Sequence, residues 1–85
     1  MDIYFSERFI SEYQLLFYSQ HSITEKIDKL VDSVELNPFG GIGKPERLKG
    51  NQNNCYSRRI TKKDRLVYKI ENDKIIFISC KGHYE

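Results

Sequence analysis

Residues 55–80 have the sequence CYSRRITKKDRLVYKIENDKIIFISC, in which β-rich runs alternate with turn signals. Cys55 to Ile60, Arg65 to Ile70 and Lys74 to Cys80 are rich in the β-branched and aromatic residues that fit a pleated sheet. Thr61-Lys62-Lys63-Asp64 and Glu71-Asn72-Asp73 join these runs and are typical of tight turns. The stretch therefore predicts an antiparallel meander of three strands.

A short strand and two helices are predicted before this meander. Ile3-Tyr4-Phe5 predicts an opening strand, and Ser6 is a candidate N-cap for a first helix. Ser22 and Glu25 have the spacing of a capping box at the start of a second helix, which Asn37-Pro38 ends. Residues at helical spacing define the expected core faces, namely Phe9, Tyr13, Leu16 and Phe17 in the first helix and Ile23, Ile27, Leu30, Val31 and Val34 in the second.

The alternation of residues along the strands indicates which face the helices cover. Leu66, Tyr68 and Ile70 share one face, which we expect to pack on the helices, while Arg65, Val67 and Lys69 share the exposed face. Residues 42–54 predict a loop. We therefore predict an α+β fold over residues 1–85, a single domain in which a short N-terminal strand and two helices pack on one face of a mainly antiparallel four-stranded sheet.

The composition excludes several classes of protein. No apolar run approaches the roughly 20 residues that span a bilayer, so we expect no membrane association. The first five residues show neither the basic nor the apolar region of a signal peptide, which favours the cytoplasm. Cys55 and Cys80 lack zinc-site spacing, so we expect two reduced, partly buried thiols and neither a metal nor a cofactor.

The charge is unevenly distributed although the net charge is only +2. Residues 1–43 hold three basic and seven acidic side chains, whereas residues 44–69 hold nine basic and two acidic ones. A basic middle on a nearly neutral protein indicates an anionic partner, with nucleic acid first. A solvated charged face is an equally good explanation of the charge alone.

The basic half holds one candidate for each role in metal-free RNA cleavage. That reaction needs a base for the ribose 2′-OH, an acid for the departing 5′ oxygen and a cation for the phosphorane. Glu46 is a candidate base between Lys44 and Arg47, His83 a candidate acid and Arg65 a candidate cation. Taken singly, each is more often a surface residue, and these residue types alone indicate only a possible RNA binder.

Five separated motifs, in order along the chain, resemble one family. They are Gly43-Lys44-Pro45-Glu46, Leu48-Lys49, Ser57-Arg58-Arg59-Ile60-Thr61, Arg65-Leu66-Val67-Tyr68 and Cys80-Lys81-Gly82-His83-Tyr84. Together they are similar to the Txe/YoeB toxins of bacterial type II toxin–antitoxin systems, within the RelE-like superfamily. The chain departs from the pattern at Asp64, where the family often has His, and at Tyr56, Arg47, Gly82 and Glu85.

The resemblance implies a ribosome-dependent mRNA endonuclease, an mRNA interferase that cuts the codon in the ribosomal A site. It implies silencing by a cognate antitoxin of the YefM/Axe kind, binding of operon DNA through that antitoxin, and a homodimer. By position, Glu46 matches the general base, His83 the general acid, Arg65 the cation and Tyr84 the aromatic that places the substrate. Lys44, Lys49, Arg58, Arg59, Lys62 and Lys63 match RNA-binding positions.

Two other classes of function remain open at this stage. In the first, the basic half binds the ribosome or DNA as a module without chemistry. In the second, the chain is a structural domain with no nucleic-acid role. A carboxylate inside the basic half favours the enzyme over the binding module.

Overall fold

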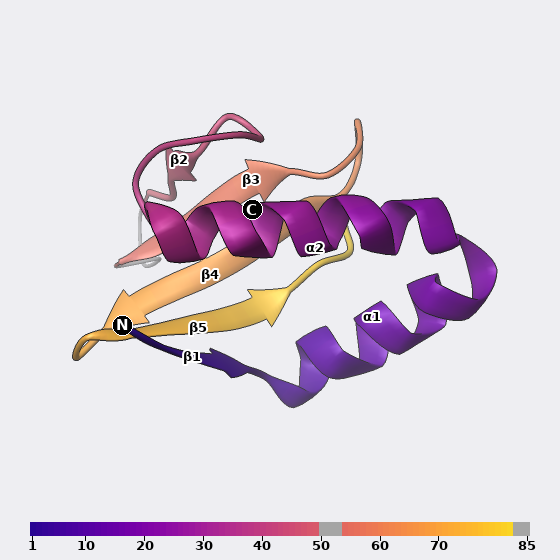
Figure 1. The fold of residues 1–85 in the computed structure, drawn as a ribbon, viewed down its shortest axis with the longest axis horizontal. Coiled ribbons are helices and arrows are strands. Elements are labelled where there is room, and N and C mark those ends of the chain that lie inside the picture. Colours follow the sequence, from indigo (N-terminus) through magenta and orange to yellow (C-terminus); the bar gives the residue numbers. More distant parts are fainter. Residues whose placement is uncertain (50–53, 83–85) are drawn as a thin grey trace.

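Residues 1–49 and 54–82 are described by a computed structural model of the chain. A five-stranded sheet and two helices follow in the order β1 (Asp2–Phe5), α1 (Glu7–Ser19), α2 (His21–Leu36), β2 (Glu46–Arg47), β3 (Cys55–Arg59), β4 (Arg65–Glu71) and β5 (Lys74–Ser79). The strand order across the sheet is β1-β5-β4-β3-β2. All pairs are antiparallel except β1 with β5 (Figure 1).

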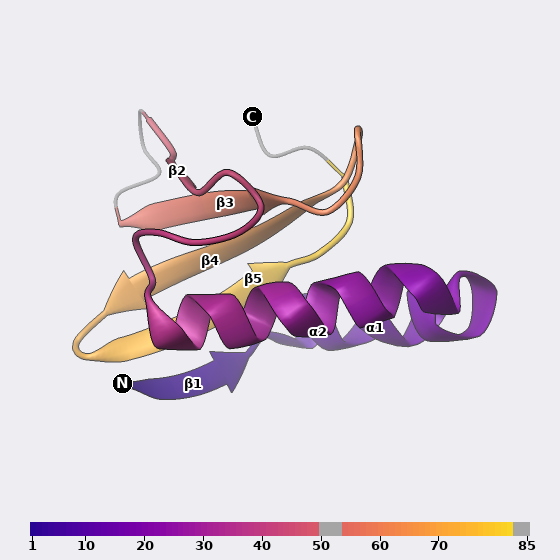
Figure 2. The same cartoon turned by 45° about the horizontal axis from the view of Figure 1, so that its top comes forward.

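The predicted α+β class is confirmed, but the sheet has one more strand than predicted. Glu46 and Arg47 lie in the segment predicted as a loop, and they pair with Ser57 and Tyr56 as the short edge strand β2 (Figure 2). A two-residue strand leaves no alternation pattern in the sequence. In the sheet it is an edge strand that pairs with β3.

Both helices pack on one face of the sheet and share one apolar core. The buried members of that core are Phe9, Leu16, Ile27, Leu30, Val34, Ile60, Leu66, Tyr68, Ile75, Phe77 and Cys80. Most of the predicted core faces are confirmed. Phe17 is the exception, because 45% of its surface is exposed.

Of the two helix N-caps predicted from the sequence, one forms in the structure and the other does not. Ser6 caps α1 as predicted, since its Oγ accepts from the Phe9 N–H at 3.0 Å. The predicted capping box at Ser22 is wrong, because the N-cap of α2 is Gln20, two residues earlier, and Gln20 makes no side-chain capping bond. A single residue, Gln20, separates the helices, so the turn that a Ser22 cap requires has no room to form.

The sheet face away from the helices is less open than the strand alternation predicted. Val67 was expected to be exposed and is 1% exposed. Its cross-strand neighbours Ser57 and Ser79 are buried as well. The sequence of one strand does not reveal this burial, because it depends on what packs over the sheet face.

None of the helices in the described part of the chain is long and apolar enough to cross a membrane. Cys55 and Cys80 are both free and buried, as predicted. Burial, with the carboxylates of Glu12 and Asp64 nearby, raises the pKa of the Cys80 thiol to about 12, so this thiol is protonated at neutral pH.

Candidate active site

The candidate base Glu46 lies on the sheet face that the helices leave uncovered. Glu46 pairs with Ser57, which pairs with Val67 on β4. Paired residues of neighbouring strands point to the same face. Arg58, the next residue on β3, points into the helix side, so Glu46 shares its face with Ser57 and Val67.

Two arginines stand in the next row of the same face. Arg59 on β3 pairs directly with Arg65 on β4, two residues along from the Ser57 and Val67 pair. With ideal sheet spacings, the Cα atoms of Glu46 and Arg65 are roughly 12 Å apart. Two long side chains can span that distance with a phosphate group between them. The sheet therefore brings together the carboxylate and the cation that the sequence predicted as partners.

The backbone before Glu46 requires a glycine. Gly43 has φ +84°, and a Cβ there would lie 2.6 Å from Leu30 Cδ2. Its carbonyl accepts from the Arg59 N–H at 2.7 Å, which ties the segment to the end of β3. The positive φ of Lys44 follows directly. This close contact with α2 directs the chain into β2 and sets where Glu46 stands.

The turn of residues 61–64 holds one side of the Arg65 guanidinium. Nη1 of Arg65 donates to the carbonyl oxygens of Thr61 at 2.8 Å, Asp64 at 3.1 Å and Lys62 at 3.3 Å. Within residues 1–49 and 54–82, no group accepts from its Nε or Nη2. The half-buried side chain is thus oriented by the backbone carbonyls of this turn, and a guanidinium fork of this kind can bind an anion through two parallel hydrogen bonds.

Arg58 was predicted to bind RNA, but the structure buries its side chain on the helix side of the sheet. It is fully buried, and all five of its N–H groups have acceptors. The acceptors are Tyr68 Oη, Ser33 Oγ and the carbonyls of Ile42, Asn37 and Gly40. A guanidinium with no remaining donor cannot contact an RNA backbone, so we correct this assignment and give Arg58 a structural role.

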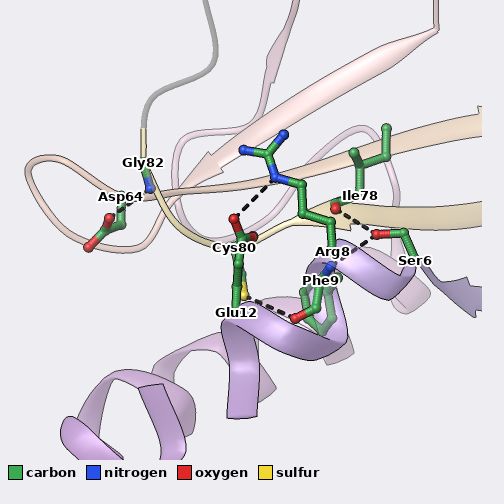
Figure 3. Close-up of polar contacts among 8 residues, drawn as sticks. All are labelled: Ser6, Arg8, Phe9, Glu12, Asp64, Ile78, Cys80 and Gly82. Atoms are coloured by element: carbon green, nitrogen blue, oxygen red, sulfur yellow. Dashed lines mark hydrogen bonds and ion pairs between the residues drawn. The ribbon is translucent and has the colours of Figure 1, made fainter. Parts of the chain in front are cut away.

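The other predicted RNA-binding residues of the described chain are exposed. They are Lys44, Lys49, Arg59, Lys62 and Lys63. The predicted acid His83 and the predicted aromatic Tyr84 lie outside the described residues. Gly82, which precedes them, accepts from the Arg65 N–H at 3.0 Å, so Gly82 lies beside the start of β4 (Figure 3).

Two lysines of α2 extend the basic surface and were missed in the sequence. Lys26 and Lys29 line a hollow of about 600 Å³ together with Lys44 and Arg59. They belong to the half of the chain with a net negative charge, so the charge of that half does not indicate a basic surface there. Their spacing of three residues on the exposed face of the predicted helix was the available signal.

No group of three His, Cys, Asp or Glu side chains suited to a metal occurs in the described part of the chain. The residues of the site are thus one carboxylate, several cations and a backbone that fixes their spacing.

Comparison with known proteins agrees with this fold. The chain is 39% identical over 87 residues to the toxin YoeB of Synechocystis, covering 100% of this chain and 99% of that protein. Its structure matches a YoeB/ParE toxin from Agrobacterium tumefaciens with a TM-score of 0.93 at 32% identity, covering 99% and 100% of the two chains.

A Staphylococcus aureus YoeB is similar as well, with 39% identity over 99% of this chain and 98% of that one. It has been solved as a dimer, with a TM-score of 0.89, and in a heterotetrameric complex with YefM, with a TM-score of 0.86. These folds and sequences define a bacterial toxin of a toxin–antitoxin pair. Residues 5–84 match the model of the YoeB-like toxins of bacterial type II toxin–antitoxin systems, and the chain belongs to that family.

Proposed function

We propose that this toxin is a ribosome-dependent mRNA endonuclease that cleaves the codon in the A site without a metal ion. The observation that carries the proposal is the shared sheet face of Glu46, Arg59 and Arg65. A protein that only binds RNA gains nothing from a carboxylate among these cations, because that carboxylate repels phosphate. A base for the 2′-OH needs such a position.

In the proposed reaction Glu46 accepts the proton of the ribose 2′-OH. The 2′ oxygen then attacks the adjacent phosphorus, and the bond from phosphorus to the 5′ oxygen breaks. Arg65 stabilises the extra negative charge of the phosphorane through its guanidinium group, and His83 donates a proton to the 5′ oxygen. The products are a 2′,3′-cyclic phosphate, which opens to a 3′-phosphate, and a 5′-hydroxyl.

The exposed basic residues hold the RNA in this proposal. Lys49 assists near the scissile phosphate, and Tyr84 packs on a base of the substrate. Lys44, Arg59, Lys62 and Lys63 contact the backbone of the messenger or of ribosomal RNA. Lys26 and Lys29 join this set because they share a hollow with Lys44 and Arg59.

The proposed partners follow from the family. The Staphylococcus aureus relative has been solved as a dimer and with YefM. We accordingly propose a homodimer and a YefM/Axe-like antitoxin for this chain. Operon DNA is bound through that antitoxin, and the toxin acts in the cytoplasm, where the ribosomes are.

The test is single-turnover cleavage of a defined A-site codon, measured by quench-flow on ribosome complexes. Glu46→Gln and His83→Gln should each slow cleavage about 10²–10⁴-fold, and Arg65→Ala at least as much. Glu71→Gln, at the other end of β4, is the matched control and should cleave at the parent rate. A Glu46→Gln, His83→Gln double variant that still cleaves at the parent rate refutes the assignment.

A further inference from the structure

The segment of residues 37–42, which connects α2 to β2, is tied to the sheet by two buried side chains. Figure 2 shows the connection running from the end of α2 to β2. Four of its carbonyl oxygens accept hydrogen bonds from Arg58 or Tyr68, both of them fully buried. These carbonyls are those of Asn37 at 2.7 Å, Pro38 at 2.6 Å, Gly40 at 2.9 Å and Ile42 at 3.2 Å. The segment is therefore held by the interior of the protein, although most connections between elements bind water with their carbonyls.

Ser33 of α2 completes this network from the helix side. Its Oγ accepts from Arg58 Nη1 at 2.7 Å and from the Ile42 N–H at 3.4 Å. The chain then passes directly over this pair. A Cβ at Gly41 would lie 2.5 Å from Ser33 Oγ and 3.0 Å from Arg58 Nη1, and a Cβ at Gly43 would lie 3.1 Å from Arg58 Cβ. Ser33 and Arg58 thus contact the turn of residues 41–44 from below.

This turn has an unusual backbone conformation. Gly41, Gly43 and Lys44 all have positive φ, of +120°, +84° and +52°. A residue other than glycine rarely adopts such a φ, because its Cβ then crowds the following carbonyl oxygen. A conformation of this kind persists only where the surrounding structure holds it, and it is found most often at functional sites. The contacts with Ser33 and Arg58 are the restraint that the conformation of Lys44 requires.

The turn leads directly to the proposed base. Glu46 follows Lys44 by two residues and begins β2, an edge strand of only two residues that pairs with β3. So short a strand makes few ladder hydrogen bonds. The direction in which the chain leaves the turn therefore helps to decide where the Glu46 carboxylate lies on the sheet face.

We propose that Ser33 and Arg58 are positioning residues for cleavage, which hold the turn of residues 41–44 and thereby place Glu46 against the ribose 2′-OH. The inference rests on the proposed function, in which Glu46 is the base. Both residues act through Glu46, and neither contacts the substrate. A misplacement of about 1 Å costs on the order of 10² in rate for a group that must transfer a proton.

Ser33→Ala tests the proposal with little risk to the helix, because Ala is a better helix former than Ser. It should slow single-turnover cleavage about 10–100-fold at saturating toxin, where weaker binding through Lys44 does not affect the rate. Ser33→Thr keeps the hydroxyl group and should restore most of the rate. Ser19→Ala is the matched control, since it removes a helix hydroxyl that bonds to the Leu15 carbonyl of α1, and it should cleave at the parent rate.

Gly41→Ala displaces the same turn from its other side. The added Cβ would meet Ser33 Oγ at 2.5 Å, and the φ of +120° disfavours any side chain. We expect a loss of rate similar to that of Ser33→Ala. Gly40→Ala is the control, because its Cβ would meet only the end of the Asn37 side chain, at 3.1 Å, and its carbonyl remains available to Arg58. Far-UV circular dichroism establishes that each variant is folded.

A double variant separates positioning from a general loss of structure. Once Glu46→Gln has removed the base, displacement of the turn has no proton transfer left to impair. Ser33→Ala added to Glu46→Gln should therefore cause no further loss of rate, whereas a damaged fold would multiply the two effects.

The outcomes distinguish this inference from the proposed function. Cleavage at the parent rate by Ser33→Ala and Gly41→Ala overturns the positioning role. A further loss in the Glu46→Gln background, or a Ser33→Thr rate as low as that of Ser33→Ala, overturns it as well. Cleavage at the parent rate by Glu46→Gln alone instead overturns the base role of Glu46 in the proposed function.

Discussion

Replacement of the buried Arg58 by Ala should remove a large part of the stability of this toxin. Five hydrogen bonds from a charged donor contribute roughly 1.5–3 kcal/mol each. Removing the guanidinium from water costs several kcal/mol, which offsets part of that sum. No carboxylate reduces this cost, because none of the ion pairs among the described residues includes Arg58. We expect a net loss of about 3–5 kcal/mol in the free energy of unfolding.

That loss is large for a chain of this size. A domain of 85 residues is expected to have a free energy of unfolding of roughly 4–13 kcal/mol. The chain has no Trp, so urea unfolding is best followed by far-UV circular dichroism. Arg58→Lys keeps the charge but offers three donors in place of five, and should lie between the parent and Arg58→Ala.

Arg59→Ala provides a matched control for this experiment. It removes the same side chain one residue along β3, from an exposed position on the opposite face. Its effect should stay within about 0.5 kcal/mol. If Arg58→Ala is no more destabilising than Arg59→Ala, the five bonds do not stabilise the fold and the reasoning fails.

Two other predictions concern binding. Replacement of Lys62 and Lys63 together by Gln should make ribosome binding less sensitive to salt, because fewer counterions are released. The cleavage position, read by primer extension, should stay the same. A shifted position would mean that these lysines contact bases. The free toxin should sediment as a dimer at micromolar concentration, and a single monomeric species across the range would contradict the proposed homodimer without affecting the catalytic assignment.

Local patterns predicted the elements of this fold well. The β-rich runs of residues 55–80 became β3, β4 and β5, and the turn at Asn72 and Asp73 formed with both residues at positive φ. Ser6 capped α1 as its position indicated. Such features depend on a few neighbouring residues, and for that reason they can be read from the sequence.

Features that depend on contacts between distant segments were not predictable. Arg58 is indistinguishable from Arg59 in the sequence, and only strand parity and the position of Ser33 on α2 decide which one is buried. The same holds for β2, which exists only as a partner of β3. The hydrogen bond from the Gly82 N–H to the Asp64 carboxylate joins residues 18 positions apart, and no periodic pattern marks it.

The position of β5 between β1 and β4 also governs when this protein can first become a toxin. β1 pairs only with β5 in the sheet, and Ser6 Oγ, at the start of α1, donates to the Ile78 carbonyl. A nascent chain that ends before residue 74 therefore has no partner for β1 and no strand under the first helix. Because β5 is the last strand of the described chain and lies between β1 and β4, a chain interrupted before residue 74 lacks the strand that joins β1 to the rest of the sheet, and we expect it to have no toxicity.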